Sequence, residues 1–364
     1  MFDFLLKILC LFGLTHNPSS CNKKGVAHFA FRALLWITYV DTILMYSISA
    51  FNVNFNSKIV VVNMICITTS AALVFIMTRQ RETLTNLIKV LRVKNPLDQE
   101  KNLNFLIICL LCLPFTYAFT MVMFYAMSEQ DFMFDFFTYG IAIEDKAMKY
   151  VIAYYKYLMY YFLYLTLPNL VTTTYVVSCR TCSESIQQLS LKGENCSPKA
   201  FTSRVQIGFM KDRKYIMKLV EEIQTVFSRA SFFICMTNFM SCLSNLGQII
   251  FYLTQNVAPT LIEILFISFS ALTSMLSIFY YAGQIPIEMK RLTQVLKNKF
   301  EDRVLLGTDQ DNSIVERLLI EENTFVMSGC DLIFFTRNGI LPVLGTILTY
   351  GLLILSLDLK HKTQ

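Results

Sequence analysis

The chain carries little charge for its length. Only 16% of its 364 residues are Asp, Glu, Lys or Arg, whereas about a quarter of the residues in a soluble domain are charged. Hydrophobic residues make up 54% of the sequence, with 31 Phe and 18 Tyr among them, and the mean hydropathy is +0.49. One soluble core cannot hide so much apolar surface. The composition therefore excludes an ordinary soluble domain and predicts an all-α protein that crosses a membrane several times.

Residues that carry catalysis are scarce as well. The three histidines, His16, His28 and His361, are scattered along the chain. Cys179 and Cys182 form a Cys-x-x-Cys pair, but a zinc site needs a second pair or nearby histidines. The sequence has no glycine-rich phosphate-binding loop. We therefore expect a protein that is not an enzyme and has no metal and no cofactor.

Signals of secretion and oxidation are missing too. Met1–Leu14 is apolar, but it lacks a basic start and a small-residue cleavage site. We interpret this segment as a short helix at the cytoplasmic membrane interface. None of the 11 cysteines falls in the loops assigned below to the outer side. We therefore expect reduced thiols without a disulfide framework.

Seven stretches have the length and apolar character of a membrane-spanning helix, which needs about 20 residues. They are Phe29–Phe51, Ile59–Thr78, Leu103–Met127, Tyr150–Cys179, Ser231–Thr254, Pro259–Gly283 and Asp331–Leu357. The start of the seventh stretch is the least well defined, because Arg337 and Pro342 lie inside this stretch. Pro342 is expected either to kink this helix or to mark its effective start.

The basic residues are distributed by loop. Of the 32 Lys and Arg residues, 25 lie before the first span, at its very start (Arg32), or in the loops after the second, fourth and sixth spans. Cytoplasmic loops of membrane proteins carry this excess. The N-terminus is therefore predicted to be cytoplasmic and the C-terminus extracellular, which is the reverse of a G-protein-coupled receptor. Because this distribution explains the net charge of +6, we expect membrane lipid rather than nucleic acid as a partner.

Two cytoplasmic stretches continue the helical pattern of their spans. Apolar residues recur at helical spacing within Met210–Phe227 and again within Ile285–Leu296, with charges between them. Apolar stripes of this kind must be shielded from water by lipid or by other protein segments. The alternatives are a helix lying on the bilayer surface and a packed cytoplasmic bundle that ties subunits together; the spacing favours the bundle.

The last span carries a recognisable pattern near the end of the chain. Thr349 and Tyr350 are followed by five mostly apolar residues, Gly351–Leu355, and then by Ser356 and Leu357. This resembles the C-terminal signature of insect gustatory receptors, in which a Thr-Tyr pair and five hydrophobic residues precede Gln-Phe. Here Ser-Leu replaces Gln-Phe. Gly351 stands where the sugar-receptor branch tends to have Glu, which favours the divergent, bitter-type members.

The resemblance implies a function and an assembly. Members of that family look like ligand-gated cation channels, in which four subunits place their seventh helices around a central pore. It implies a multi-pass receptor in the plasma membrane of chemosensory neurons, opened by a small-molecule tastant and passing cations. Homomeric and heteromeric tetramers both remain open, and an odorant receptor subunit with a co-receptor, or a secondary transporter, is the alternative.

Hydroxyls and leucines share one face of the last span. The expected pore and gate residues are Thr346, Thr349, Leu353, Ser356 and Leu357, which follow one another at helical spacing. Small hydroxyl residues also pack membrane helices together. The pore is therefore what the resemblance implies, while ordinary helix packing is the alternative from spacing alone.

Aromatic and polar residues gather toward the outer ends of spans three to six. The expected ligand-pocket residues are Tyr117, Thr120, Phe124, Tyr154, Tyr155, Tyr157, Asn245, Gln248 and Glu263. Aromatic walls with a few polar groups suit a small molecule, although an interfacial aromatic belt is the alternative. Asp41, Lys156 and Glu263 are ionisable groups within spans, so Lys156 is expected to snorkel or to pair with Asp41 or Glu263.

These assignments divide the chain into five parts. Residues 1–28 form a cytoplasmic segment, 29–283 hold six spans with the ligand pocket, and 284–330 form a cytoplasmic helical linker. Residues 331–357 form the pore-lining helix, and 358–364 form an extracellular tail.

Overall fold

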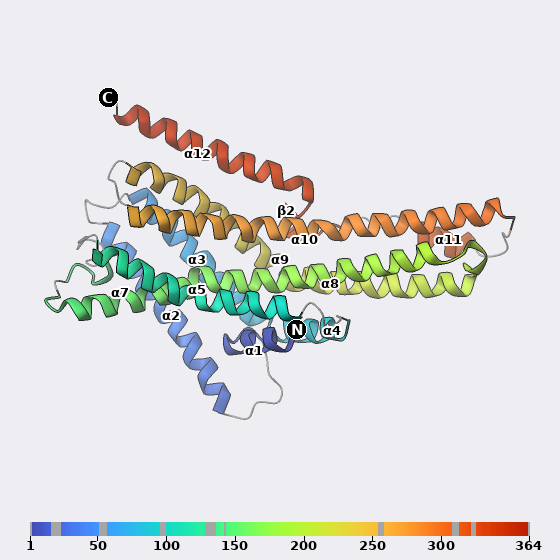
Figure 1. Cartoon of the computed structure of the whole chain (residues 1–364), viewed down its shortest axis with the longest axis horizontal. Coiled ribbons are helices and arrows are strands. Elements are labelled where there is room, and N and C mark those ends of the chain that lie inside the picture. The colour runs from blue at the N-terminus through green and yellow to red at the C-terminus, as the bar shows by residue number, and fades with distance from the viewer. Residues whose placement is uncertain are drawn as a thin grey trace.

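The computed structural model describes residues 2–15, 23–50, 57–94, 100–127, 136–141, 143–253, 258–307, 313–321 and 325–362. These residues form an elongated, almost entirely helical molecule (Figure 1). The first part of the chain contains α1 (Phe2–Leu11), α2 (Lys23–Ala50), α3 (Ser57–Arg79), α4 (Arg81–Lys94) and α5 (Glu100–Met127). The middle contains α7 (Lys146–Tyr161), η2 (Phe162–Thr166), α8 (Leu167–Asn195), η3 (Pro198–Ala200) and α9 (Ser203–Leu253). The last part contains α10 (Ala258–Leu305), α11 (Ser313–Ile320), β1 (Ser328–Gly329), β2 (Ile333–Phe334), η4 (Arg337–Gly339) and α12 (Ile340–Lys362).

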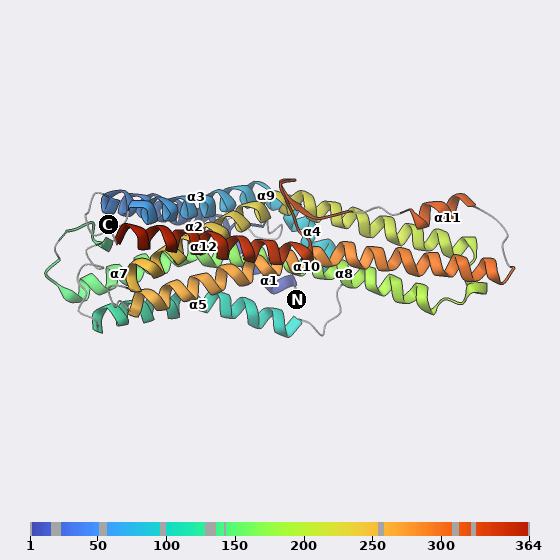
Figure 2. The same ribbon diagram turned by 90° about the horizontal axis from the view of Figure 1, so that it is seen from above.

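The predicted helical membrane fold is confirmed. Among the described residues, six helical segments are long and apolar enough to cross a membrane: those of α2, α3 and α5, the joined α7–η2–α8, and those of α9 and α10. A further helix, α12, is 23 residues long and ends at the same end of the molecule as the start of α7 (Figures 1 and 2). The chain is therefore a multi-pass helical membrane protein.

Three helices are much longer than a bilayer requires. The joined α7–η2–α8 segment has 50 residues, α9 has 51 and α10 has 48, whereas about 20 suffice. Beyond the other helices only α8, α9, α10 and α11 continue, as a separate end of the molecule (Figure 1). There the apolar stripes of α9 and α10 are buried in one core with α8, so a helix lying alone on a bilayer surface is excluded.

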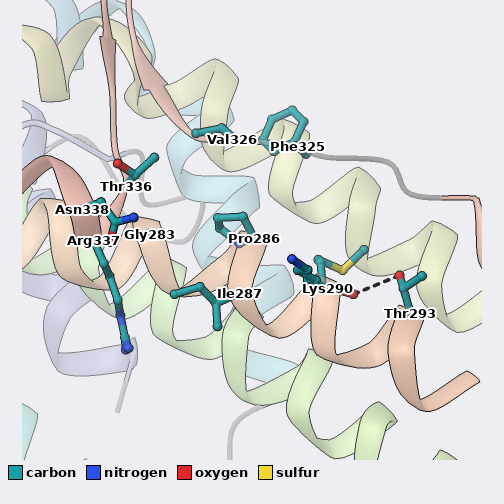
Figure 3. A pocket seen from close by; sticks show the side chains of 11 residues that line it. Gly283, Pro286, Ile287, Lys290, Thr293, Phe325, Val326, Thr336, Arg337 and Asn338 are labelled. Carbon is teal, nitrogen blue, oxygen red and sulfur yellow. Dashed lines mark hydrogen bonds between the residues drawn. The ribbon is translucent and has the colours of Figure 1, made fainter. Parts of the chain in front are cut away.

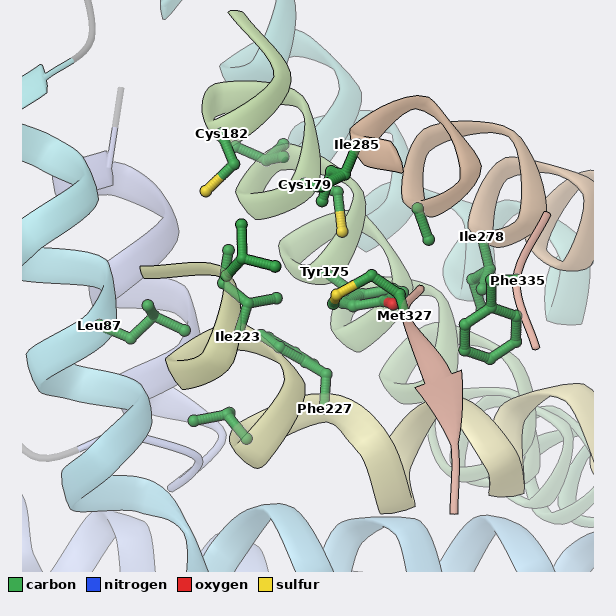
Figure 4. Close-up of a cluster of buried hydrophobic side chains, with 14 of the residues drawn as sticks. Leu87, Tyr175, Cys179, Cys182, Ile223, Phe227, Ile278, Ile285, Met327 and Phe335 are labelled. Atoms are coloured by element: carbon green, nitrogen blue, oxygen red, sulfur yellow. The ribbon is translucent and has the colours of Figure 1, made fainter. Parts of the chain in front are cut away.

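Side chains from α8, α9 and α10 and from the segment before α12 pack together in one hydrophobic core. Tyr175, Phe227 and Phe335 are almost completely buried; the Tyr175 ring packs tilted against Phe227 and edge-on against Phe335, with centroids 5.1 Å and 6.3 Å apart (Figure 4). Cys179 and Cys182 are buried free thiols in the same core. Burial on this scale, at about 25 cal/mol per Å² of apolar surface, is what holds the long helices together.

A wide turn joins α7 to α8. In η2 the Leu167 backbone N–H bonds to the carbonyl of Phe162, five residues earlier. The cause is the next residue, Pro168, which has no N–H to donate and whose ring crowds the preceding turn. Such π-type turns occur often at functional sites, and this one follows directly after the tyrosines of α7.

The predicted start of the last span is wrong. The span was expected to begin at Asp331, but α12 begins at Ile340, and Pro342 lies in its first turn, where proline is tolerated. Residues 328–334 instead form a short antiparallel hairpin. Its turn needs left-handed backbone at Cys330 and Asp331, with φ of 53° and 56°, so a helix cannot run through it.

Candidate ligand site and pore helix

A cluster of tyrosines fills the space between α5 and α7. Tyr117 packs against Tyr161 with ring centroids 3.8 Å apart, and it also stacks on Phe266 of α10 at 5.3 Å. Tyr157 lies within 6.5 Å of Tyr117 and parallel to Tyr125 at 6.4 Å. These four tyrosines are less than a tenth exposed. We call Tyr117, Tyr157, Tyr161 and Phe266, together with Glu263, the tyrosine cluster.

Glu263 supplies the charge of the tyrosine cluster. Its carboxylate interacts electrostatically with the hydroxyls of Tyr117 and Tyr157, and also with that of Tyr161. The Tyr117 hydroxyl lies within hydrogen-bonding reach of the Glu263 carboxylate and of the Tyr161 hydroxyl. The three groups therefore form one polar network inside the aromatic cluster. The cluster therefore combines hydrogen-bonding groups with an aromatic wall, which is the composition of small-molecule sites.

The other expected pocket residues divide into three groups. Asn245 is buried and donates to the Ser268 hydroxyl at 2.9 Å, which joins α9 to α10 beside the tyrosine cluster. Half-buried residues follow: Phe124, Tyr154 and Gln248, whose amide donates to Ser244 on its own helix. Thr120 and Tyr155 are exposed, and the Thr120 hydroxyl bonds to its own helix. The structure thus brings together Tyr117, Tyr157 and Glu263, with Asn245 nearby.

Lys156 pairs with Asp41 rather than with Glu263. Its ammonium lies 3.2 Å from the Asp41 carboxylate and 3.9 Å from the centre of the Tyr139 ring. The Tyr139 hydroxyl donates to the same carboxylate oxygen. A charge in a membrane segment needs such partners. This ion pair joins α2, the 136–141 segment and α7 just outside the tyrosine cluster.

Among the described side chains of α12 (340–351 and Leu353), the buried ones lie on one face of the helix. Ile347 is 6% exposed and Gly351 is buried, whereas Leu341, Leu348 and Leu353 are 76%, 63% and 51% exposed. At 3.6 residues per turn, Thr349 and Leu353 lie on the side opposite to Ile347 and Gly351. Among the expected pore residues Thr346 is half-buried and Thr349 is exposed; the side chains of Ser356 and Leu357 lie outside those the structure describes.

Gly351 allows α12 to approach α9 closely. A Cβ atom at this position would lie only 2.5 Å from the Cδ1 atom of Leu246. Leu246 is the neighbour of Asn245, which bonds to Ser268. One short stretch of α9 therefore touches both α12 and the polar link to α10.

The segment before α12, which contains the hairpin, contacts α9 on one side and α10 on the other. Gln224 of α9 donates to the Ser328 carbonyl at 2.9 Å and accepts from the Ser328 N–H at 3.1 Å. On the other side, Arg337 donates to Gln284 of α10 and lies 4.3 Å from the Tyr280 ring centre. A cavity of about 330 Å³ lies between α10 and this segment, with Pro286 facing Phe325 (Figure 3). The start of α12 is thus held by α9 and α10.

Several residues of this region were not expected from the sequence. Tyr161 and Phe266 complete the tyrosine cluster, and Tyr139 completes the ion pair. Helical spacing signals the first two, because Tyr161 follows Tyr157 by four residues and Phe266 follows Glu263 by three. No sequence signal places Tyr139, which lies in a connecting segment with a positive φ of 59°.

Metal chemistry has no visible basis in the described part of the chain. No three His, Cys, Asp or Glu side chains of those residues are grouped so that they can hold a metal ion. The site consists of aromatic, hydroxyl and single charged groups. Together with the bundle of long helices, these features define the class: a multi-pass helical membrane protein with an intramembrane polar cluster and one peripheral, exposed helix.

The fold is similar to that of solved structures. Neither a protein-family model nor a curated protein sequence matches the chain. The structure of the insect olfactory receptor OR5 from Machilis hrabei is similar with a TM-score of 0.70, and the likeness covers 98% of this chain and 99% of that one. The same receptor in complex with eugenol gives a TM-score of 0.72 over 98% of both chains. The sequences are 13% identical, so the likeness establishes the fold: the chain has the fold of an insect olfactory receptor.

Proposed function

We propose that the chain is a gustatory receptor, a subunit of a ligand-gated, non-selective cation channel that assembles as a tetramer around α12. The observation that carries this proposal is the exposed face of α12. Leu341, Leu348 and Leu353 of this helix are more than half exposed, so most of its surface is open to lipid, to neighbouring subunits or to a pore. The fold supports the proposal, and the Thr349–Tyr350 signature favours a gustatory receptor over an odorant receptor.

The tyrosine cluster is the proposed ligand site. A small molecule bound between α5, α7 and α10 hydrogen-bonds to Glu263 and to the hydroxyls of Tyr117 and Tyr161. Its binding shifts α10 relative to α5, and the Asn245–Ser268 bond passes this shift to α9. Leu246 then moves α12 at Gly351, and Thr349 and Leu353 turn at the pore axis. The channel opens only to the extent that the ligand binds the open state more tightly.

Whole-cell current tests this proposal. Cells that express only this chain are challenged with bitter alkaloids, sugars, amines and eugenol. We expect a ligand-evoked cation current, and a larger leak without ligand in Leu353→Ala, because the substitution removes apolar side chains from the gate. Surface-expressed protein that gives a G-protein signal and no conductance would refute the channel.

Glu263→Gln tests the ligand site separately. The amide keeps the shape of the carboxylate but removes its charge, so the half-maximal concentration of an amine agonist should rise about tenfold, equivalent to about 1.4 kcal/mol. Glu184→Gln, in the second half of α8 and outside the tyrosine cluster, is the matched control and should leave the concentration unchanged. An equal effect of both variants would place the ligand elsewhere.

The alternative function is an odorant receptor subunit that works with a co-receptor. The observation in its favour is the fold of the solved olfactory receptor, which was also determined with eugenol. The two proposals differ in a measurable way. A subunit that depends on a co-receptor conducts only when that co-receptor is expressed with it, whereas the proposed gustatory receptor conducts alone or with receptors of its own family.

A further inference from the structure

An open groove extends along the described helices from the back of the tyrosine cluster, where Phe266 belongs to both. It has a volume of about 510 Å³ and is formed by α5, α8 and α10, which is the size of small-molecule sites. It extends along α8 from Arg180 to Asn169, about 16 Å at 1.5 Å per residue. Arg180 lies at the predicted inner membrane interface, so the groove runs from there toward the middle of the bilayer.

The two walls of the groove differ in chemistry. The α5 wall is formed by Leu103, Leu106, Leu110 and Leu113, at helical spacing. The opposite wall, from α8 and α10, is rich in hydroxyl and amide groups. Two pairs of them bond across these helices: Asn169 to Ser270 at 2.9 Å, and Thr172 to Ser274 at 3.0 Å. Thr273 and Ser277 add further hydroxyls, and Thr273 is exposed.

The polar wall faces a region where the bilayer supplies no hydrogen bonds. All three helices have membrane-spanning segments, so a molecule reaches the groove through the lipid. A purely hydrocarbon chain gains nothing from a wall of hydroxyls. An occupant with a flat apolar face for the leucines and an oxygen for the polar wall satisfies both sides.

The charge of the groove lining indicates which class of molecule fits the groove. Among the described residues that line the groove, Arg180 alone carries a full charge. Its guanidinium is already paired with Glu184, one turn along α8, at 2.8 Å. The groove is therefore close to neutral, which disfavours the anionic head of a phospholipid and favours a neutral molecule.

We propose that this groove binds a neutral, hydroxyl-bearing apolar molecule of the sterol type, taken up from the inner half of the membrane. Its body lies along the leucines of α5, and its hydroxyl bonds near Ser277 and Thr273. Phe266 lines the deep end of the groove and stacks on Tyr117 at 5.3 Å. The occupant thus touches the back of the tyrosine cluster through one ring. This proposal does not depend on channel function.

Photolabelling tests the proposal directly. The full-length chain is placed in phosphatidylcholine vesicles with a photoreactive, clickable cholesterol analogue, and the labelled peptides are mapped by mass spectrometry. We expect saturable labelling on α5, α8 and α10 that unlabelled cholesterol displaces. Thr273→Phe fills the groove and should weaken the labelling about tenfold, equivalent to about 1.4 kcal/mol.

The controls separate the groove from the general lipid surface. Thr116→Phe adds the same ring to an exposed position of α5 that does not line the groove, and it should label as the unsubstituted chain does. Ser277→Phe gives a second test if Thr273→Phe fails to fold. Labelling that does not saturate, that maps elsewhere, or that both groove variants retain would overturn the proposal. Displacement by an anionic photoreactive phospholipid but not by cholesterol would also overturn it and assign the groove to a phospholipid.

Discussion

Asp41 and Lys156 show how single residues hold the outer part of the bundle. Lys156 is 13% exposed and Asp41 is 30% exposed, and Tyr139 contacts both. The pair is only partly buried, so its contribution lies between that of surface and buried ion pairs. Its structural effect is to fix the 136–141 segment and α2 against α7, next to Tyr157.

Breaking this ion pair should cost stability. We expect Lys156→Met to lower the free energy of unfolding by about 1–3 kcal/mol, because it leaves Asp41 without its cation. The double variant Lys156→Met with Asp41→Leu should recover most of that loss, since no charge then remains unpaired. Thermal unfolding of the purified protein in detergent measures both. A double variant that loses as much as the sum of the two single variants would contradict the pairing.

The sequence predicts which charged residues lie within the spans, but it does not predict which side chains surround them in the folded protein. Asp41, Lys156 and Glu263 stand out because charges are rare within spans, and the Lys156–Asp41 pair was one of the partners expected. Tyr139 lies in a connecting segment far from Asp41 in sequence, so no periodicity places it there. Tyr155 and Tyr157 look alike in the sequence, yet one is half exposed and the other is buried, because only the rotation of α7 decides which tyrosine faces inward.

At the scale of elements, contacts between α12 and its neighbours depend on glycines. Gly351 touches Leu246 of α9, and a Cβ at Gly283 of α10 would lie 2.7 Å from the Arg337 backbone nitrogen. The first contact is with the end of a flexible side chain, and the second is with backbone. The two positions should therefore respond differently to the same substitution.

Gly351→Ala should alter gating rather than folding. The added methyl displaces Leu246 or pushes α12 away from α9, so the balance between closed and open channel shifts. Adding Leu246→Ala removes the clash and should restore the ligand concentration that gives a half-maximal current. The measurement is the four-way cycle of these variants in whole-cell recording. Additive effects of the two substitutions would show that the contact does not link α9 to α12.

Gly283→Ala should destabilise the protein. Backbone atoms of Thr336 and Arg337 cannot move aside cheaply, and we expect a loss of about 1–3 kcal/mol from overpacking. Gly208 of α9 is the matched control, because nothing lies within 4 Å of a Cβ there. Gly208→Ala should be neutral or stabilise by up to about 1 kcal/mol, since alanine favours the helix. A similar melting temperature for both variants would contradict the close packing of the hairpin.

The sequence predicts the helices well, but it predicts the ends of the helices and the segments that connect them less well. Apolar runs and helical stripes are local signals, so the expected continuation of the fifth and sixth spans into the long helices α9 and α10 is confirmed. The hairpin at 328–334 has only two residues in each strand and was taken for helix. It forms because α9 and α10 supply hydrogen bonds and packing through Gln224, Ser228 and Phe279, and such tertiary contacts leave no periodic pattern.

At the scale of the whole molecule, helices α9 and α10 connect the tyrosine cluster to α12. The tyrosine cluster lies among α5, α7 and α10, and α12 lies on the outside, held at its start by the hairpin and farther along at Gly351. The helices α9 and α10 touch both regions. A single chain with this arrangement leaves the Thr349 face of α12 exposed. In the proposed tetramer, four chains around an axis turn that face into the wall of a pore.

The most direct test of this central claim is thiol modification of α12 during whole-cell recording. In Thr349→Cys, a membrane-impermeant cationic thiol reagent applied with ligand should reduce the evoked current, and the reaction should be faster with ligand than without. Ile347→Cys, on the face of α12 that is 6% exposed, should not respond. If Thr349→Cys carries a normal current that the reagent leaves unchanged in both states, α12 does not line the pore.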